Sequence, residues 1–142
     1  MSTMGPIRWG LLGTSRINAK LLAGARLSDN AEVVAVGSRS TAAGEAFARE
    51  HGIERMHGSY EALLADSDVD AVYIPLPNSL HHPWTLTALA AGKHVLCEKP
   101  YTRHPAEVDV AWDAAEASGL VLMEAFMWRH TPQAARLVAL LP

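Results

Sequence analysis

The sequence predicts a doubly wound α/β domain built on a parallel sheet, and three observations support this prediction. Short apolar runs rich in β-branched residues alternate along the chain with longer segments of helical spacing. The runs lack polar alternation, which is typical of parallel strands that are covered on both faces. The 142 residues are enough for one such domain with its own core. A strand–helix rhythm of this kind implies right-handed crossovers between the strands.

The apolar runs place the strands, and the segments between them place the helices. Strands are expected at residues 7–12, 32–37, 71–74, 94–97 and 121–125, with a short extra strand near 55–57. Helices are expected at residues 15–27, 41–51, 59–65, 80–91 and 105–118. The final segment, TPQAARLVALLP, begins another amphipathic helix. Its apolar stripe of Leu137, Val138, Leu140 and Leu141 has little chain left to cover it, so we expect something to follow or dock there.

Capping residues agree with these boundaries. Ser40 or Thr41 is placed to cap the second helix, and Gly52 is placed to end it. Gly92 and Gly119 each follow a predicted helix and lie just before a predicted strand. Glycine is favoured at such positions because it adopts positive φ angles without steric cost.

Composition and charge exclude several classes of function. The net charge of −3 gives no electrostatic footprint for nucleic acid or an anionic membrane, so neither is expected as a partner. The longest apolar runs have strand length, far short of a membrane span, and the N-terminus lacks a secretory signal. A single cysteine, Cys97, favours a reducing cytoplasm and the role of a small buried hydrophobe. No spacing of His, Cys and Asp resembles a zinc site, so no metal is expected.

The loop after the first strand is the expected site for an anion. In a doubly wound sheet, ligands bind at the carboxyl ends of the strands beside the switch point. Glycine there permits a tight turn, and the start of the next helix offers free N–H groups and a positive dipole end. Ser15 and Asn18 stand where a dinucleotide fingerprint has small residues, so an ordinary βα turn is the alternative. The residues expected to hold a pyrophosphate are Gly13, Thr14, Ser15, Arg16 and Ile17.

The end of the second strand selects between the two nicotinamide cofactors. A site for NAD usually places an acidic residue here to bond the ribose 2′-hydroxyl, whereas an arginine accommodates a 2′-phosphate. This sequence has Ser38 and Arg39 and no acid, so NADP is favoured over NAD. A solvated loop arginine is the alternative reading of Arg39.

Three later motifs make the pattern specific: VYIPLPNSLH, HVLCEKPYT and EAFMWRHTPQ. A strand followed by Glu-Lys-Pro resembles the glucose–fructose oxidoreductase, inositol dehydrogenase and rhizopine-catabolism family (Gfo/Idh/MocA). The chain looks like the N-terminal NAD(P)-binding Rossmann domain of that family. Within the family, the first and third motifs resemble the branch of xylose dehydrogenases and dimeric dihydrodiol dehydrogenases.

The resemblance implies an NADP-dependent oxidoreductase that transfers hydride between nicotinamide and a hydroxyl of a sugar, polyol or trans-dihydrodiol. It implies that Lys99 is catalytic and hydrogen-bonds the reacting hydroxyl or carbonyl. The other residues that it implies to lie at the cofactor are Pro77, Asn78, His81, Glu98, Trp128 and Arg129.

The chemistry of a lysine at this position is consistent with that role. The positive charge of oxidised nicotinamide disfavours a protonated Lys99, whereas the neighbouring Glu98 favours it. Pro100 sets the backbone just beyond the strand. Its peptide bond is expected to be trans, with cis as the alternative.

The resemblance also implies a second α+β domain that holds the substrate and that this chain lacks. We expect residues 1–126 to form the cofactor domain and residues 127–142 to begin the connection to the second domain. The isolated chain is then expected to be nearly inactive, with a sugar-like substrate and homo-oligomer formation belonging to the full-length enzyme. A non-catalytic dinucleotide-binding module is the alternative function. A methyltransferase-like domain is disfavoured because Glu-Lys-Pro and Ser-Arg have no purpose there.

Overall fold

The computed structural model describes residues 5–141 and contains a six-stranded parallel sheet with the order β3-β2-β1-β4-β5-β6. The order reverses between β1 and β4, which is the switch point of a doubly wound sheet. The predicted fold class is therefore confirmed. The strands are β1 (Ile7–Leu12), β2 (Ala31–Gly37), β3 (Arg55–His57), β4 (Ala71–Ile74), β5 (His94–Cys97) and β6 (Leu122–Glu124).

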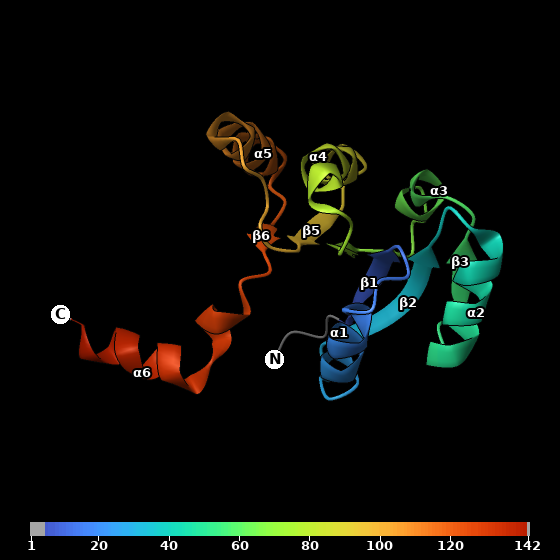
Figure 1. Ribbon diagram of the computed structural model, residues 1–142, viewed down its shortest axis with the longest axis horizontal. Coiled ribbons are helices and arrows are strands. Elements are labelled where there is room, and N and C mark those ends of the chain that lie inside the picture. Colours follow the sequence, from blue (N-terminus) through green and yellow to red (C-terminus); the bar gives the residue numbers. More distant parts are fainter. Residues whose placement is uncertain (1–4, 142) are drawn as a thin grey trace.

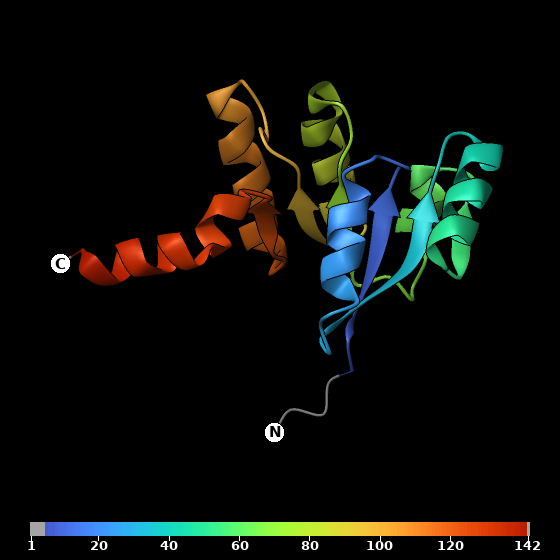
Figure 2. The same ribbon diagram turned by 60° about the horizontal axis from the view of Figure 1, so that its bottom comes forward.

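Helices cover the sheet from both sides (Figures 1 and 2). α1 and α2 lie on one face, whereas α3, α4 and α5 lie in a row on the other (Figure 1). Each face has its own cluster of buried apolar side chains. The helices are α1 (Asn18–Ala25), α2 (Thr41–His51), α3 (Tyr60–Leu64), α4 (His81–Ala90), α5 (Pro105–Ser118) and α6 (Pro132–Leu140), with 3₁₀ turns η1 (Asn78–Leu80) and η2 (Met127–His130).

Local sequence signals determine most of the boundaries. The Ser40 hydroxyl accepts the N–H of Ala43 and caps α2, and Gly52 ends that helix with a left-handed φ of 68°. Gly119 ends α5 in the same way. The expectation for α1 is wrong by three residues at its start, because Ser15 to Ile17 form a tight turn instead of helix. The N–H of Asn18 bonds the carbonyl of Ser15 in that turn.

The expectation that both faces are fully covered is wrong for the β5 and β6 half of the sheet. The crossovers from β1 to β3 place α1 and α2 over one half of their face, and every later crossover runs over the opposite face. An apolar hollow of about 490 Å³ therefore lies on the α1 side, with Trp9, Leu96, Met123 and Phe126 among its lining residues. No crossover helix in residues 5–141 lies over this hollow, which we call the bare half-sheet.

The last helix projects away from the sheet (Figures 1 and 2). α6 contacts η2, and its apolar residues Leu137, Val138 and Leu140 are exposed together with Leu141, which follows the helix, as the sequence predicted. The Thr131 hydroxyl accepts the N–H of Ala134 and caps this helix.

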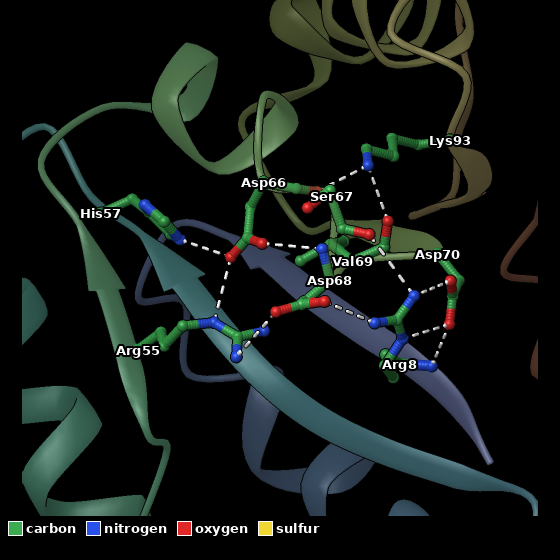
Figure 3. Close-up of polar contacts among 9 residues, drawn as sticks. All are labelled: Arg8, Arg55, His57, Asp66, Ser67, Asp68, Val69, Asp70 and Lys93. Atoms are coloured by element: carbon green, nitrogen blue, oxygen red, sulfur yellow. Dashed lines mark hydrogen bonds and ion pairs between the residues drawn. The ribbon is translucent and has the colours of Figure 1, made fainter. Parts of the chain in front are cut away.

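A polar network closes the edge of the sheet at which β1 begins (Figure 3). Arg8 donates from Nη2 and Nε to the two carboxylate oxygens of Asp70, at 2.7 and 2.9 Å, and from Nη1 to Asp68. Lys93 is buried, and its ammonium donates to the carbonyl oxygens of Asp66 and Val69, both at 2.7 Å. These contacts fasten the loop between α3 and β4 to both neighbouring strands.

Asp66 is the most buried carboxylate of this network. Its Oδ2 accepts from Arg55 Nε and lies beside His57 Nε2, each at 3.0 Å, and its Oδ1 accepts the N–H of Asp68 (Figure 3). Burial raises the pKa of Asp66, but these donors outweigh it and leave the pKa below its usual value. The Arg8 guanidinium likewise lowers the pKa of Asp70.

Candidate cofactor and catalytic site

Gly13 makes the turn that follows β1, and no other residue fits there without strain. Its φ is 98°, and its N–H donates to the carbonyl of Gly37 at 2.8 Å. A Cβ at this position would lie 3.2 Å from Leu76 Cδ2 and 3.3 Å from the Tyr60 hydroxyl. The sequence prediction for Gly13 therefore has a steric basis.

The turn after Gly13 presents backbone donors at the carboxyl edge of the sheet. Within residues 5–141, the N–H groups from Thr14 to Ile17 have no hydrogen-bond acceptor. They immediately precede α1, so the positive end of that helix dipole adds to their attraction for an anion. The side chains of Thr14 and Ser15 are partly exposed, and Arg16 is exposed. This donor set suits a phosphate group.

Asn18 occupies the place of the third small residue in the fingerprint, and the structure gives a physical reason for it. Its side chain is fully buried at 0% exposure, and Nδ2 donates to the carbonyl of Gly13 at 2.8 Å. Oδ1 is buried without a partner among the described residues. The helix and strand therefore accommodate this side chain, which closes the turn that a third glycine leaves open.

Ser38 and Arg39 have different roles after β2. Ser38 is buried, and its hydroxyl donates to the carbonyl of Ser40 and accepts the N–H of the same residue. That hydroxyl shapes the turn, so it is not free to hold a 2′-phosphate as the sequence suggested. Arg39 is exposed and forms no ion pair within residues 5–141, which leaves its guanidinium available to a ligand.

The motif after β4 divides into an exposed part and a buried part. Pro77 and Asn78 are exposed at the start of η1. His81 is 1% exposed, with Nδ1 2.9 Å from the carbonyl oxygen of Pro100 and Nε2 2.7 Å from that of Leu76. Both nitrogens thus face the backbone, and neither is available to a cofactor. His81 supports the two loops instead of contacting a ligand, which corrects the expectation for this residue.

The loop after β5 exposes Lys99 and fixes its neighbour. Tyr73 donates its hydroxyl to Glu98 Oε1 at 2.6 Å, and the N–H of Lys99 donates to Glu98 Oε2 at 3.2 Å. Burial, followed by the bond to Glu98, raises the pKa of Tyr73, so Tyr73 remains a donor. The sequence did not indicate Tyr73, because its role depends on β4 lying beside β5. The Lys99–Pro100 peptide bond is cis, where trans was expected; proline makes both isomers accessible.

A pocket of about 430 Å³ lies on the α4 and α5 side of this loop. Its lining includes Asn78, His82, Pro100, Arg103 and His104. Neither Arg103 nor His82 was indicated by the sequence, because they meet only when the start of α4 lies beside the loop before α5.

Trp128 and Arg129 lie in η2 and are exposed. The Trp128 ring packs against Phe126 with 6.2 Å between ring centres. The Arg129 side chain forms no hydrogen bond or ion pair within residues 5–141. Their expected place beside a cofactor stays a prediction.

Cys97 is buried and unpaired, and burial raises its pKa to about 12. It is therefore a neutral thiol inside the sheet, as the sequence predicted.

Across the described part of the chain, no group of three His, Cys, Asp or Glu side chains is arranged to hold a metal ion. No helix between residues 5 and 141 is both long and apolar enough to cross a membrane.

The predicted site residues follow one another along the carboxyl edge of the sheet. Arg39 follows β2, Gly13 follows β1, Asn78 follows β4 and Lys99 follows β5, which is also the spatial order of these strands. The donor turn lies beside the switch point, where doubly wound domains bind dinucleotides. Fold and site together define a dinucleotide-binding Rossmann domain.

Comparison with known families agrees with this class and makes it specific. Residues 7–126 match the oxidoreductase family GFO_IDH_MocA, described as an NAD-binding Rossmann fold. The chain belongs to this family.

Individual relatives give the family context. The chain is 48% identical over 134 residues to D-xylose 1-dehydrogenase (NADP(+)) 2 of Haloferax volcanii, covering 92% of this chain and 41% of the relative. It is 40% identical over 128 residues to trans-1,2-dihydrobenzene-1,2-diol dehydrogenase of Sus scrofa, covering 89% and 38%. The crystal structure of KijD10, a 3-ketoreductase from Actinomadura kijaniata in complex with NADP and TDP-benzene, superposes with a TM-score of 0.87 at 41% identity, over 94% of this chain and 41% of that one. The chain thus spans about two fifths of the length of these relatives.

Proposed function

We propose that this chain is the cofactor domain of an NADP-dependent oxidoreductase that transfers hydride between nicotinamide and a hydroxyl carbon of a sugar, polyol or trans-dihydrodiol. The observation that carries the proposal is the exposed Lys99 beside a fixed Glu98, on the same sheet edge as the donor turn of Gly13. The names of the relatives, which include a xylose and a dihydrodiol dehydrogenase, support the substrate class.

The residues present fit a dinucleotide with a 2′-phosphate. Gly13 gives the turn its positive φ, and the free N–H groups from Thr14 to Ile17 suit the pyrophosphate. Arg39 supplies a guanidinium for the 2′-phosphate. Pro77 and Asn78 are exposed where the nicotinamide half would lie, and Trp128 and Arg129 are proposed to approach it from η2.

In the proposed reaction, Lys99 exchanges the proton that accompanies hydride transfer. The bound nicotinamide supplies the hydride acceptor or donor. In the oxidation direction, a neutral Lys99 amine takes the proton of the substrate hydroxyl and becomes an ammonium. In the reduction direction, the ammonium returns that proton to the carbonyl oxygen. Glu98, held by Tyr73, accepts the backbone N–H of Lys99 and so fixes the loop that carries the amine.

The parts of the enzyme beyond cofactor binding follow from the family resemblance. We propose that residues 1–126 form the cofactor domain and residues 127–142 begin the connection to a substrate domain. The substrate contacts and homo-oligomer formation belong to that second domain. A cytoplasmic location is proposed because the Cys97 thiol is buried and unpaired.

Two measurements test this function. NADPH fluorescence is titrated against the 142-residue chain, with NADH and S-adenosylmethionine in parallel. We expect NADPH to bind most tightly, and binding of S-adenosylmethionine alone would contradict the proposal.

The second measurement uses a chimaera in which this chain replaces the matching 134-residue region of the Haloferax volcanii dehydrogenase. We expect it to oxidise xylose with NADP, and Lys99→Ala to abolish turnover while NADPH still binds. If the Lys99→Ala variant instead bound NADPH and kept its turnover, the catalytic role of Lys99 would be contradicted.

A further inference from the structure

The loop from Cys97 to Tyr101 has Lys99 at its centre, and the exit of β6 holds both of its ends. Ala125 donates its N–H to the carbonyl of Cys97 at 2.7 Å. Glu124, the last residue of β6, accepts the N–H of Tyr101 on its carboxylate Oε1 at 2.8 Å. Two consecutive residues, the last of β6 and the one after it, therefore hold the residues that begin and end the loop.

Contacts from the other side hold the middle of the loop. The Tyr73 hydroxyl bonds Glu98, and His81 faces the carbonyl of Pro100. The Lys99 side chain, in contrast, is exposed and forms no hydrogen bond or ion pair within residues 5–141. The loop is thus fixed around a lysine that remains free to meet a ligand.

We propose that Glu124 is a positioning residue for Lys99, acting through the backbone of Tyr101. The proposal rests on the function given above, in which Lys99 exchanges the proton. The Tyr101 ring is buried and packs edge-on against Trp112, with 5.1 Å between ring centres. The side chain of Tyr101 is therefore anchored in the core, and Glu124 sets the direction of its backbone as it leaves Lys99 and Pro100.

Glu124 makes a contact that needs a long side chain with an acceptor oxygen. The bond from Ala125 to Cys97 is between backbone groups, so any residue at position 125 except proline makes it. The bond to the Tyr101 N–H needs a side-chain acceptor of this length at the end of β6, and a carboxylate makes it charge-assisted. No other group in the described residues accepts that N–H.

The first test compares Glu124→Ala with Glu124→Gln in the 142-residue chain. Glutamine keeps an acceptor oxygen but removes the charge. We expect the Tyr101 amide to exchange with deuterium at least about tenfold faster in Glu124→Ala, because a hydrogen bond to a charged group is lost. Exchange in Glu124→Gln should remain within about threefold of the original chain, because the acceptor oxygen is kept. Glu116→Ala, which removes an exposed carboxylate from α5, is the control for a general change in charge.

The second test measures the ligand. NADPH affinity should fall several-fold in Glu124→Ala and stay close to the original in Glu124→Gln. The affinity for 2′,5′-ADP, which has the 2′-phosphate but no nicotinamide, should be unchanged in both variants. In the chimaera with the xylose dehydrogenase, kcat should fall about tenfold in Glu124→Ala with little change in the KM for xylose, and Glu124→Gln should restore it.

The outcomes separate this proposal from the function on which it rests. Unchanged Tyr101 exchange in Glu124→Ala, or equal losses in the alanine and glutamine variants, would overturn the positioning role while NADPH binding by the original chain still supports the function. If the original chain bound no NADPH, both the function and the positioning role would fall. Urea unfolding of each variant shows whether a loss comes from global instability.

Discussion

Asn18 donates a hydrogen bond from its buried amide to the carbonyl oxygen of Gly13 at 2.8 Å, so a side chain joins the first helix of the domain to the turn after β1. A glycine-based fingerprint achieves close packing at this point by removing side chains. Here Asn18 occupies the same position, and its side chain stabilises the turn by a hydrogen bond to Gly13. The departure from the fingerprint is therefore compatible with a functional site.

Replacing Asn18 tests this relationship. Asn18→Ala should lower the free energy of unfolding by about 1–3 kcal/mol, because Gly13 loses a buried donor. Asn18→Asp should lower it further, since a carboxylate of nearly the same shape faces a carbonyl oxygen without a donor. Urea unfolding and NADPH titration measure both effects, with exposed Lys20→Ala as the control. A fully stable Asn18→Asp chain would show that the hydrogen bond contributes nothing.

Gly13 and Gly52 form a matched pair for testing the turn. Both have positive φ, but a Cβ at Gly13 meets Leu76 and Tyr60, whereas a Cβ at Gly52 meets nothing within 4 Å. Gly52→Ala should therefore cost about 1 kcal/mol of stability through backbone strain and leave NADPH binding intact. Gly13→Ala should cost more and also weaken NADPH binding. If the two substitutions changed the NADPH affinity equally, the proposed role of Gly13 in NADPH binding would be contradicted.

Arg39 is expected to select the cofactor. Arg39→Ala should weaken NADPH binding about 10- to 100-fold, because a charge-assisted contact to the 2′-phosphate is lost. NADH lacks that phosphate, so its affinity should change little. Arg39→Lys keeps the charge without the planar fork and should lie between the two. Fluorescence titrations with both cofactors measure the ratio, and an unchanged ratio would contradict the role of Arg39.

Acid should weaken the polar network at the opposite edge of the sheet. The pKa values of Asp66 and Asp70 are lower in the folded chain than the ordinary value of 3.8. A carboxyl whose folded pKa is depressed adds stability above its unfolded pKa and loses that contribution as the pH falls through the folded value. These groups should thus contribute their full stability at pH 7, where the free energy of unfolding does not change with pH on their account, and that contribution should be lost below about pH 4.

Neutral variants identify the carboxyl responsible for that loss. The Asp66 side chain is 11% exposed, whereas that of Asp68 is 60% exposed. Asp66→Asn should lower stability at pH 7 by about 1–3 kcal/mol and flatten the acid dependence. Asp68→Asn should change stability by less than about 0.5 kcal/mol, because exposed ion pairs contribute little. Urea midpoints at pH 7, 4 and 3 provide the measurement. An acid dependence that persists unchanged in Asp66→Asn would locate it elsewhere.

The sequence predicts the fold well because strand and helix signals in this chain are local. The bounds of β1 and α5 agree with the prediction, since each is an uninterrupted pattern with its own end signal. The start of α1 could not be predicted, because the turn from Ser15 to Ile17 depends on the backbone bonds of the loop. The bare half-sheet was also missed, since an apolar strand has the same pattern whether one or two layers cover it.

Site residues that belong to a sequence motif could be predicted, whereas residues that contact the site from an adjacent strand could not. Gly13, Arg39 and Lys99 could be placed from the sequence because each follows a recognisable strand. Tyr73 and Glu124 could not, because they act on the loop of β5 from the strands on either side of it. Which strands are adjacent is a property of the sheet order and not of the local sequence.

The separation of Arg39 and Lys99 along the sheet edge has a practical consequence for engineering. Arg39 follows β2 and Lys99 follows β5, with β1 and β4 between them. On the proposed role of Arg39, substitutions in the turn after β2 should change cofactor preference without disturbing the contacts that Tyr73, His81 and Glu124 make with the loop of Lys99. The proposed choice of cofactor and the proposed proton exchange thus depend on separate loops, so a library of substitutions at Arg39 is expected to vary the first without the second.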